Sequence, residues 1–276
     1  MTRHKKNGAC ITIKESERQL NMDNKNNTVL SVHSLKKLFR NGRGVNNITL
    51  NVNEGDIVGL LGPNGSGKTT AMKSIIGMNR IDEGEIQIFG YDIDDDFESA
   101  MESVGCLIET PALYDRMSAY QNLKAAARFY KYPDKRTETE AINNALSLVG
   151  LDKYSKDKAG SFSLGMRQRL GIALALLPRP RLVILDEPTN GLDIEGVVHI
   201  RSVIKEMSEK NKTTFLISGH VASELEKLCD KVAVIYDGRL LAMNSMEEVL
   251  ENFPSLEDYF LSIVGNAKDT ERRRVI

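Results

Sequence analysis

The sequence lacks the features that would place the chain within a membrane or in a disulfide-stabilised class. Its 276 residues include no tryptophan and three cysteines, which lie far apart and form no Cys-x-x-Cys pair. This spacing suggests neither a disulfide framework nor a zinc site, so we expect reduced thiols, as in cytosolic proteins. No apolar run reaches the roughly 18 residues that a membrane-spanning helix needs. The N-terminal stretch also has no apolar core typical of a signal peptide.

The chain also lacks a strong net charge. Lys and Arg total 37 against 38 Asp and Glu, which gives a formal net charge of −1 and a pI of about 6.5. Without an overall basic field, we do not expect nucleic acid as a partner. The apolar fraction of 41% suffices for the core of one large or two small domains.

Composition and hydrophobic patterning divide the chain into three expected parts. Residues 1–27 are polar and rich in Lys and Asn, so we expect a disordered tail. Residues 28–243 alternate apolar strand patterns with helical patterns, which predicts an α/β domain built on a doubly wound sheet. Within it, residues from about 91 to 165 are expected to form a helical insert, with a capping box at Ser118. Residues 244–276 are expected to form a tail of two short helices.

The most informative stretch is residues 62–69, which read G-P-N-G-S-G-K-T. It lies between a short apolar strand pattern and a helical pattern, so backbone N–H groups and the helix dipole would both point at a bound anion. The pattern is a complete Walker A phosphate loop, in which Lys68 would reach the β- and γ-phosphates of a nucleotide and Thr69 would offer its hydroxyl to Mg²⁺. The expected nucleotide-binding residues of the loop are Gly62, Pro63, Asn64, Gly65, Ser66, Gly67, Lys68, Thr69 and Thr70.

A second stretch, residues 181–188, ends an apolar run with two carboxylates. Continuous apolar runs are typical of parallel strands buried on both faces, and ligands of such sheets bind at the carboxyl ends of the strands. We expect Asp186 to act on Mg²⁺, directly or through a bound water, and Glu187 to accept a proton from an attacking water. Together with the phosphate loop, this stretch predicts hydrolysis of a nucleoside triphosphate.

Between these two motifs lies the segment 161–170, which reads S-F-S-L-G-M-R-Q-R-L. It resembles the signature motif of ABC-type ATPases, usually L-S-G-G-Q-x-Q-R. The matching positions are Ser163, Gly165, Gln168 and Arg169, and the departing positions are Phe162, Leu164 and Met166. Leu164 replaces a glycine that is usual at this position. The backbone N–H groups of the segment can still donate hydrogen bonds to a phosphate, provided that Leu164 does not need a positive φ.

Three further stretches extend the resemblance over about residues 28–243. Residues 190–193 (N-G-L-D) are similar to the D-loop of ABC ATPases, and residues 218–220 (S-G-H) are similar to the H-loop. Phe39 lies where the family places an aromatic side chain that stacks on adenine. The resemblance implies a P-loop NTPase (RecA-like) core of the ABC ATPase type, with an inserted helical subdomain and an antiparallel β subdomain.

The resemblance also implies roles and partners. ATP, with Mg²⁺, would lie between two cassettes packed head to tail, in a homodimer or a heterodimer. Ser163 and Gly165 of one cassette would contact the γ-phosphate held by the other, Asp193 would couple the two sites, and His220 would hold the γ-phosphate and orient Glu187. The expected catalytic residues are Lys68, Glu187 and His220. A separate integral membrane permease would be the other partner, which implies a peripheral location on the cytoplasmic face of the cell membrane.

Glu109 stands where the family usually has a glutamine, at the entry to the helical insert. A carboxylate can still ligate Mg²⁺, so the expected metal-binding residues are Thr69, Glu109 and Asp186. The stretches 107–114 and 163–168 resemble the ATPase subunits of exporters for bacitracin and lantibiotic-type antimicrobial peptides, which act in self-immunity or resistance. Two alternatives stay open: the ATPase of another ABC-2-like exporter, for a drug or an ion, and a soluble ABC assembly ATPase.

Overall fold

The structure, a computed structural model, describes residues 27–274, so the expected tail over residues 1–27 lies outside the described part except at Asn27. Its centre is a six-stranded sheet in the order β10-β9-β3-β8-β7-β6. All neighbouring strands run parallel except β10, which pairs antiparallel with β9. The strands are β3 (Ile57–Leu61), β6 (Val104–Leu107), β7 (Leu182–Leu185), β8 (Thr214–Gly219), β9 (Lys231–Tyr236) and β10 (Arg239–Ser245). The expected α/β class is confirmed.

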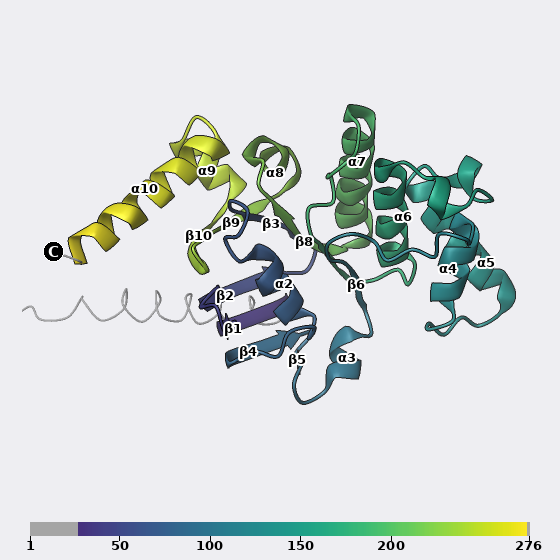
Figure 1. Cartoon of the computed structure of the whole chain (residues 1–276), viewed down its shortest axis with the longest axis horizontal. Helices are drawn as coiled ribbons and strands as arrows, with labels where there is room; N and C mark the ends of the chain where they lie inside the picture. Colours follow the sequence, from purple (N-terminus) through teal and green to yellow (C-terminus); the bar gives the residue numbers. More distant parts are fainter. Residues whose placement is uncertain (1–26, 275–276) are drawn as a thin grey trace, which may run out of the picture.

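A second, antiparallel sheet in the order β2-β1-β4-β5 forms a separate layer. Its strands are β1 (Thr28–Leu38), β2 (Gly44–Asn53), β4 (Glu83–Ile88) and β5 (Tyr91–Asp92). Helix α2 (Lys68–Ile75) packs against both sheets, because its buried Met72 and Ile75 share one apolar cluster with Ile86 of β4 and Leu60 of β3. Figure 1 shows α2 beside β1 and β2. The helix that opens with the expected phosphate loop is therefore fixed by core packing.

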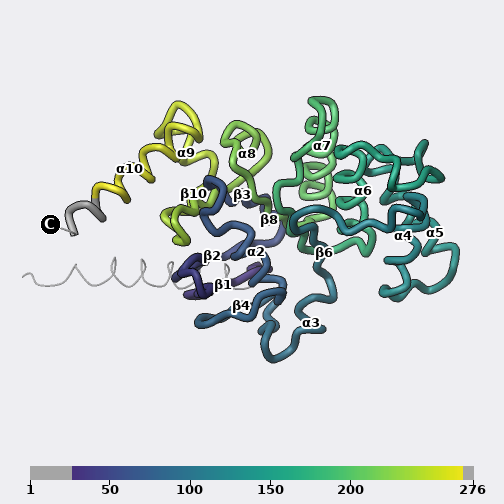
Figure 2. Tube along the Cα trace, in the orientation of Figure 1, coloured from purple at the N-terminus to yellow at the C-terminus, as the bar shows by residue number. Residues whose placement is uncertain are grey.

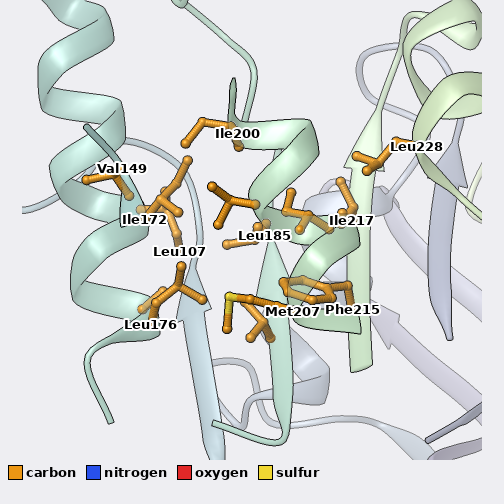
Figure 3. Close-up of a cluster of buried hydrophobic side chains, with 14 of the residues drawn as sticks. Leu107, Val149, Ile172, Leu176, Leu185, Ile200, Met207, Phe215, Ile217 and Leu228 are labelled. Atoms are coloured by element: carbon orange, nitrogen blue, oxygen red, sulfur yellow. The ribbon is translucent and has the colours of Figure 1, made fainter. Parts of the chain in front are cut away.

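The strands of the large sheet direct alternate residues to opposite faces. Phe215 and Ile217 of β8 lie in one buried cluster with Ile200 and Met207 of the long helix that precedes this strand (Figure 3). Leu216, between them, belongs instead to the cluster around α2. Because both faces of the sheet are covered, the strand sequences are continuous apolar runs.

The helical insert begins later than expected. Residues 104–107 form β6, which pairs in parallel with β7 and belongs to the large sheet, so the insert starts after Leu107 and not near residue 91. This strand has four residues, one of them Gly105. Its hydrophobic pattern is therefore too short to distinguish a strand from a helix or a loop in the sequence. The capping box is confirmed, because the Ser118 hydroxyl and the Gln121 side chain each accept the other residue's backbone N–H.

One remaining helix, Phe97–Met101 (α3), lies beside β4 and β5 of the antiparallel sheet. The others cover the large sheet and form the insert and the C-terminal segment. They are α4 (Ala119–Ala127), α5 (Lys135–Leu148), α6 (Leu164–Leu176), α7 (Ile194–Asn211), α8 (Ala222–Leu228), α9 (Met246–Asn252) and α10 (Leu256–Arg274), with 3₁₀ turns at Asp152–Tyr154 and Ala159–Ser161. None of the helices in the described part of the chain is long and apolar enough to cross a bilayer.

The second helix of the C-terminal segment is longer than expected. The sequence predicted two short helices, but α10 runs for 19 residues and extends away from α9 (Figure 2). Leu256, Tyr259 and Val264 are buried at helical spacing and keep this helix packed beyond its first turns. The Tyr259 hydroxyl also donates to Asn244 Oδ1 at 2.7 Å, which ties α10 to β10.

The contact between β6 and α6 gives a testable prediction about stability. A Cβ atom added at Gly105 would lie 2.0 Å from the backbone oxygen of Ala175, so Gly105→Ala forces backbone of the strand or the helix to move. We expect a loss of about 1–3 kcal/mol in the free energy of unfolding, as for other overpacked cores, measured by urea denaturation. Gly265→Ala is the matched control: the added Cβ meets no atom within 4 Å, so this helical site should lose no stability. Equal midpoints for Gly105→Ala and the unchanged chain would contradict the close packing.

Candidate functional site

The phosphate loop joins β3 to α2 and contains two glycines with positive φ. Gly65 and Gly67 have φ angles of 81° and 107°, which favour glycine. Gly62 has no room for a side chain, because a Cβ there would lie 2.2 Å from the Ile235 backbone oxygen. Helix α2 begins at Lys68, and its N-cap residue, Gly67, provides no side-chain cap. Its first N–H groups are therefore not capped by a side chain and point into the loop, as an anion-binding helix terminus requires.

The Lys68 ammonium lies over this loop. Its Nζ donates to the backbone oxygens of Gly62 and Pro63 at 2.7 and 3.1 Å, and the residue is buried. Burial lowers the pKa of Lys68, an effect opposed by the nearby carboxylates of Glu187 and Asp186. The direct partners of the ammonium are neutral carbonyls, so an anionic group in the loop would gain a strong charge-assisted hydrogen bond.

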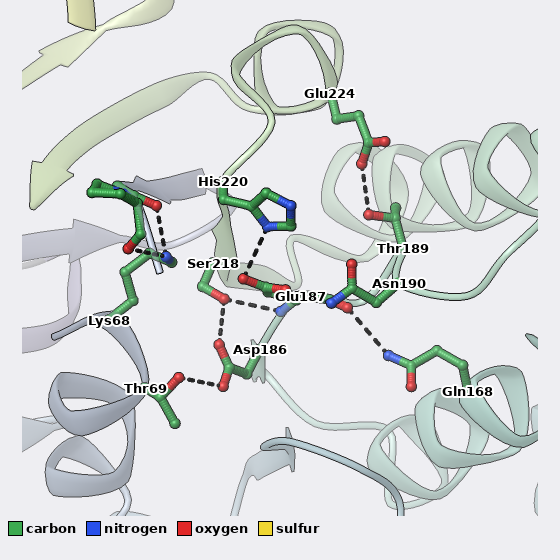
Figure 4. Close-up of polar contacts among 12 residues, drawn as sticks. Lys68, Thr69, Gln168, Asp186, Glu187, Thr189, Asn190, Ser218, His220 and Glu224 are labelled. Carbon is green, nitrogen blue, oxygen red and sulfur yellow. Dashed lines mark hydrogen bonds and ion pairs between the residues drawn. The ribbon is translucent and has the colours of Figure 1, made fainter. Parts of the chain in front are cut away.

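The two strand-end carboxylates meet the phosphate loop at the carboxyl edge of the large sheet. Thr69 Oγ1 donates to Asp186 Oδ2 at 2.8 Å (Figure 4). The Ser218 hydroxyl donates to the other oxygen of Asp186 and accepts the backbone N–H of Glu187 at 2.9 Å. A hydroxyl and a carboxylate that converge in this way fit a Mg²⁺ ion completed by phosphate oxygens and water, since Mg²⁺ is usually held by only one or two carboxylates.

Glu187 lies in the left-handed backbone region, with φ of 48°, and points its carboxylate at His220. The distance between His220 Nδ1 and Glu187 Oε1 is 3.1 Å (Figure 4). An ionised carboxylate only accepts hydrogen bonds, so Nδ1 carries the proton in this contact. The other oxygen, Oε2, accepts the side-chain amide of Asn190. A cavity of about 470 Å³ lined by α7, α8 and residues 187–192 adjoins this pair.

The segment that resembles the signature motif lies at the N-terminus of α6. Ser163 caps this helix by accepting the N–H of Met166 at 3.2 Å, which leaves the Ser163 hydroxyl proton free to donate elsewhere. Leu164 is helical, 63% exposed and not among the residues with positive φ. A leucine can therefore replace the usual glycine at this position without backbone strain. Gly165 packs against the Gly191 backbone oxygen, which a Cβ would approach to 2.8 Å.

Two expected site residues, Asp193 and Phe39, have partners within this chain. The Asp193 carboxylate caps α7 by accepting the Gly196 N–H at 2.9 Å, and Arg169 approaches the same oxygen at 3.3 Å. Phe39 lies on the turn between β1 and β2 and is 43% exposed, with Lys37 Nζ 5.9 Å from its ring centre. This exposed ring is open to a stacking ligand.

The expected metal-binding set is divided in the structure. Thr69 and Asp186 are in contact, whereas the Glu109 carboxylate pairs with Lys73 of α2 at 2.6 Å. Within residues 27–274 no group of three or more His, Cys, Asp or Glu side chains could hold a metal ion. Glu109 would therefore have to leave Lys73 to reach a metal beside Asp186.

Two polar residues of this site, Ser218 and Gln168, belong to stretches that resemble family motifs but had no expected role of their own. Ser218 links Asp186 to Glu187, and it could have been found from strand register: β7 and β8 are parallel with Leu185 opposite Ile217, so the next residues of both strands are neighbours. Gln168 was matched only as part of a motif, yet its Nε2 donates to the Glu187 backbone oxygen at 3.3 Å. No sequence signal gives this contact, because it depends on how α6 packs against the sheet.

The fold and this site define a class of protein. A phosphate loop faces two carboxylates at the carboxyl edge of a parallel sheet, in a chain with a helical insert and an antiparallel sheet, and these are the parts of a P-loop nucleoside triphosphatase. The chain belongs to the ABC transporter family, whose family model matches residues 45–190. The predicted family is confirmed, and the chain is an ATP-binding and ATP-hydrolysing cassette. ATP-binding subunits of this family work with membrane permease subunits and dimerise.

Relatives and solved structures agree with this assignment. The chain is 42% identical over 219 residues to the uncharacterized ABC transporter ATP-binding protein YdbJ of Bacillus subtilis, covering 79% of this chain and 70% of that protein. It is 39% identical to the bacitracin transport ATP-binding protein BcrA of Bacillus licheniformis (78% and 69% covered). It is 35% identical to the lantibiotic transport ATP-binding protein SrtF of Streptococcus pyogenes (84% and 96% covered). A solved ATP-binding subunit of an ABC transporter superposes with a TM-score of 0.78 at 28% identity, covering 86% of this chain and all of that one.

Proposed function

We propose that this chain hydrolyses ATP to power export of an antimicrobial peptide, of the bacitracin or lantibiotic type, through a separate membrane subunit. The observation that carries the ATPase part is the convergence of Thr69, Asp186 and Glu187 at one edge of the sheet, next to an uncapped helix N-terminus. This convergence supports a site that combines phosphate-binding groups with a proton acceptor, as hydrolysis requires.

The roles follow from these contacts. The backbone of residues 62–70 and the Lys68 ammonium would bind the triphosphate, and Thr69 and Asp186 would hold Mg²⁺, which neutralises phosphate charge when bound. Glu187 would accept the proton of the attacking water. His220 already contacts Glu187 through Nδ1, so its Nε2 is left to face the γ-phosphate. Phe39 would stack on the adenine ring.

A second cassette would complete each ATP site. Ser163 and Gly165 lie at the N-terminus of α6, which packs in the cluster on the opposite face of the large sheet from α2 and its phosphate loop. This arrangement suits an anion supplied by another molecule. The Asp193 carboxylate contacts Arg169 of α6, so the segment that resembles the D-loop is joined to the helix that carries Ser163 and Gly165. ATP would hold two cassettes together, and hydrolysis would let them part. The pair is either two copies of this chain or a heterodimer.

The transport substrate is proposed from relatives and from Glu109. Named relatives are ATP-binding proteins of bacitracin and lantibiotic transport. The chain also has a glutamate at the entry to the insert, as expected for that type of exporter. We place the chain on the cytoplasmic face of the cell membrane, held there by the permease. Movement of the Glu109 loop with the insert would transmit the ATP state to that subunit.

Glu109→Gln is expected to keep ATP hydrolysis within about tenfold of the unchanged chain, because an amide oxygen of the same geometry can still ligate Mg²⁺. The variant also loses the Lys73 ion pair, but the Glu109 side chain is 60% exposed and such pairs contribute little. Steady-state phosphate release at saturating ATP measures the effect. A loss of over about a hundredfold, which is more than loss of one weak contact explains, would show that the negative charge itself is required.

The proposed function is tested by capture of the membrane partner. Tagged chain carrying Glu187→Gln is incubated with ATP and gently solubilised membranes of its own cells, and co-purifying proteins are identified by mass spectrometry. Stoichiometric recovery of a multi-span protein supports the exporter, and sensitivity of cells lacking that protein to bacitracin and lantibiotics tests the peptide substrate. Unchanged peptide sensitivity with altered drug or ion tolerance would favour another ABC-2-like exporter. Recovery of soluble partners alone would favour an assembly ATPase. The same chain without ATP is the control.

A further inference from the structure

The side chain of Asn190 holds the carboxylate that would accept the proton of water. Asn190 Nδ2 donates to Glu187 Oε2, while His220 Nδ1 lies 3.1 Å from Oε1, so each carboxylate oxygen has its own donor (Figure 4). The backbone N–H of Asn190 also donates to the Glu187 backbone oxygen at 3.1 Å. This closed turn brings the amide of residue 190 back onto residue 187.

From this geometry we infer that Asn190 is a positioning residue for ATP hydrolysis. A contact between His220 and Oε1 alone fixes one oxygen and leaves the carboxylate free to rotate about it. The second donor on Oε2 fixes the plane of the group, and each oxygen keeps a lone pair for water. The fold therefore already holds the Glu187 carboxylate in one orientation, and the entropy cost of ordering it is not incurred in each turnover. The inference rests on the proposed role of Glu187 as proton acceptor.

The backbone of Glu187 is held independently of the Asn190 side chain. The buried Gln168 of α6 donates to the Glu187 backbone oxygen at 3.3 Å, and the Ser218 hydroxyl accepts the Glu187 N–H at 2.9 Å. Asn190 itself is exposed. Removing its amide therefore leaves the main chain of the catalytic segment anchored and frees only the carboxylate. A substitution at this position should change the chemical step more than ATP binding.

The test is the separation of kcat from KM in two variants. Asn190→Ala removes the donor and is expected to lower kcat by about ten- to a hundredfold, the range expected for one hydrogen bond to a charged group, with KM for ATP unchanged. Asn190→Asp keeps the shape but sets a carboxylate against Glu187, and its kcat should fall further. Thr189→Val is the matched control: it breaks a 2.6 Å hydrogen bond from the same turn to Glu224, and kcat should stay close to that of the unchanged chain.

A second measurement separates positioning from a structural role in the D-loop. Glu187→Gln alone and with Asn190→Ala is incubated with ATP, and the dimer fraction is measured by gel filtration. Equal dimer fractions support positioning. A smaller dimer fraction with Asn190→Ala, or a kcat for that single variant at or above that of the unchanged chain, overturns it. Failure of the proposed function would look different, because Glu187→Gln would then hydrolyse ATP at the normal rate whatever residue stands at position 190.

Discussion

A chain carrying Glu187→Gln is expected to bind ATP normally and to hydrolyse it about 10² to 10⁴ times more slowly, the factor that general-base assistance usually contributes. The amide keeps the size of the side chain and can still contact His220, but it cannot accept a proton from water. The backbone contacts of residue 187 to Ser218 and Gln168 do not involve its side chain and should persist. ATP should therefore accumulate in an assembled but unreactive site.

The accumulated state makes this prediction measurable in two ways. Phosphate release gives the rate, and gel filtration with ATP should show dimers that disappear when ATP is omitted. Glu224→Gln is the matched control, because this carboxylate of α8 lies near the same segment and accepts its hydrogen bond from Thr189 and not from the donors that hold the Glu187 carboxylate. It should hydrolyse ATP near the normal rate. A Glu187→Gln chain that stays monomeric with ATP would count against head-to-tail assembly.

Sequence alone was enough for the phosphate loop and the strand-end carboxylates because both are local patterns. The strand, glycine turn and helix around Lys68 follow one another in the chain, so their geometry depends on residues 57–75 and little else. Asp186 and His220 lie near each other because both follow apolar strands, and neighbouring parallel strands end at the same edge of a sheet. Local signals such as the Ser118 capping box were confirmed for the same reason.

Features that depend on packing between distant segments could not be predicted. The strand β6 is short, and only its pairing with β7 reveals that residues 104–107 belong to the sheet. The pairing of Glu109 with Lys73 depends on how α2 lies relative to the loop after β6. The contact of Asn190 with Glu187 depends on the left-handed backbone conformation of Glu187. The sequence gives no sign of this conformation, because it is uncommon in residues other than glycine.

Lys68→Ala is expected to abolish tight ATP binding, lowering affinity by roughly 30-fold to 10³-fold or more, because loss of one partner of a buried charged contact typically costs about 2–5 kcal/mol. The Lys68 ammonium is buried over the loop, and its hydrogen-bond partners within residues 27–274 are the neutral carbonyls of Gly62 and Pro63, so a bound triphosphate would supply the opposite charge. The variant should keep its fold without nucleotide. Burial disfavours the charged form of Lys68, which lowers its pKa, so removing this buried charge should not destabilise the nucleotide-free chain.

Calorimetric titration with MgATP measures this loss, and the melting temperature with and without MgATP gives an independent reading, because a ligand stabilises only the state that binds it. The unchanged chain should melt higher with MgATP, and Lys68→Ala should show no such shift. Lys73→Ala is the matched control: it removes the same charge from the same helix, but Lys73 faces Glu109 and not the phosphate loop, so the MgATP shift should remain. Equal loss of the shift in both variants would mean that the positive charge of α2, and not the placement of Lys68 in the loop, governs binding.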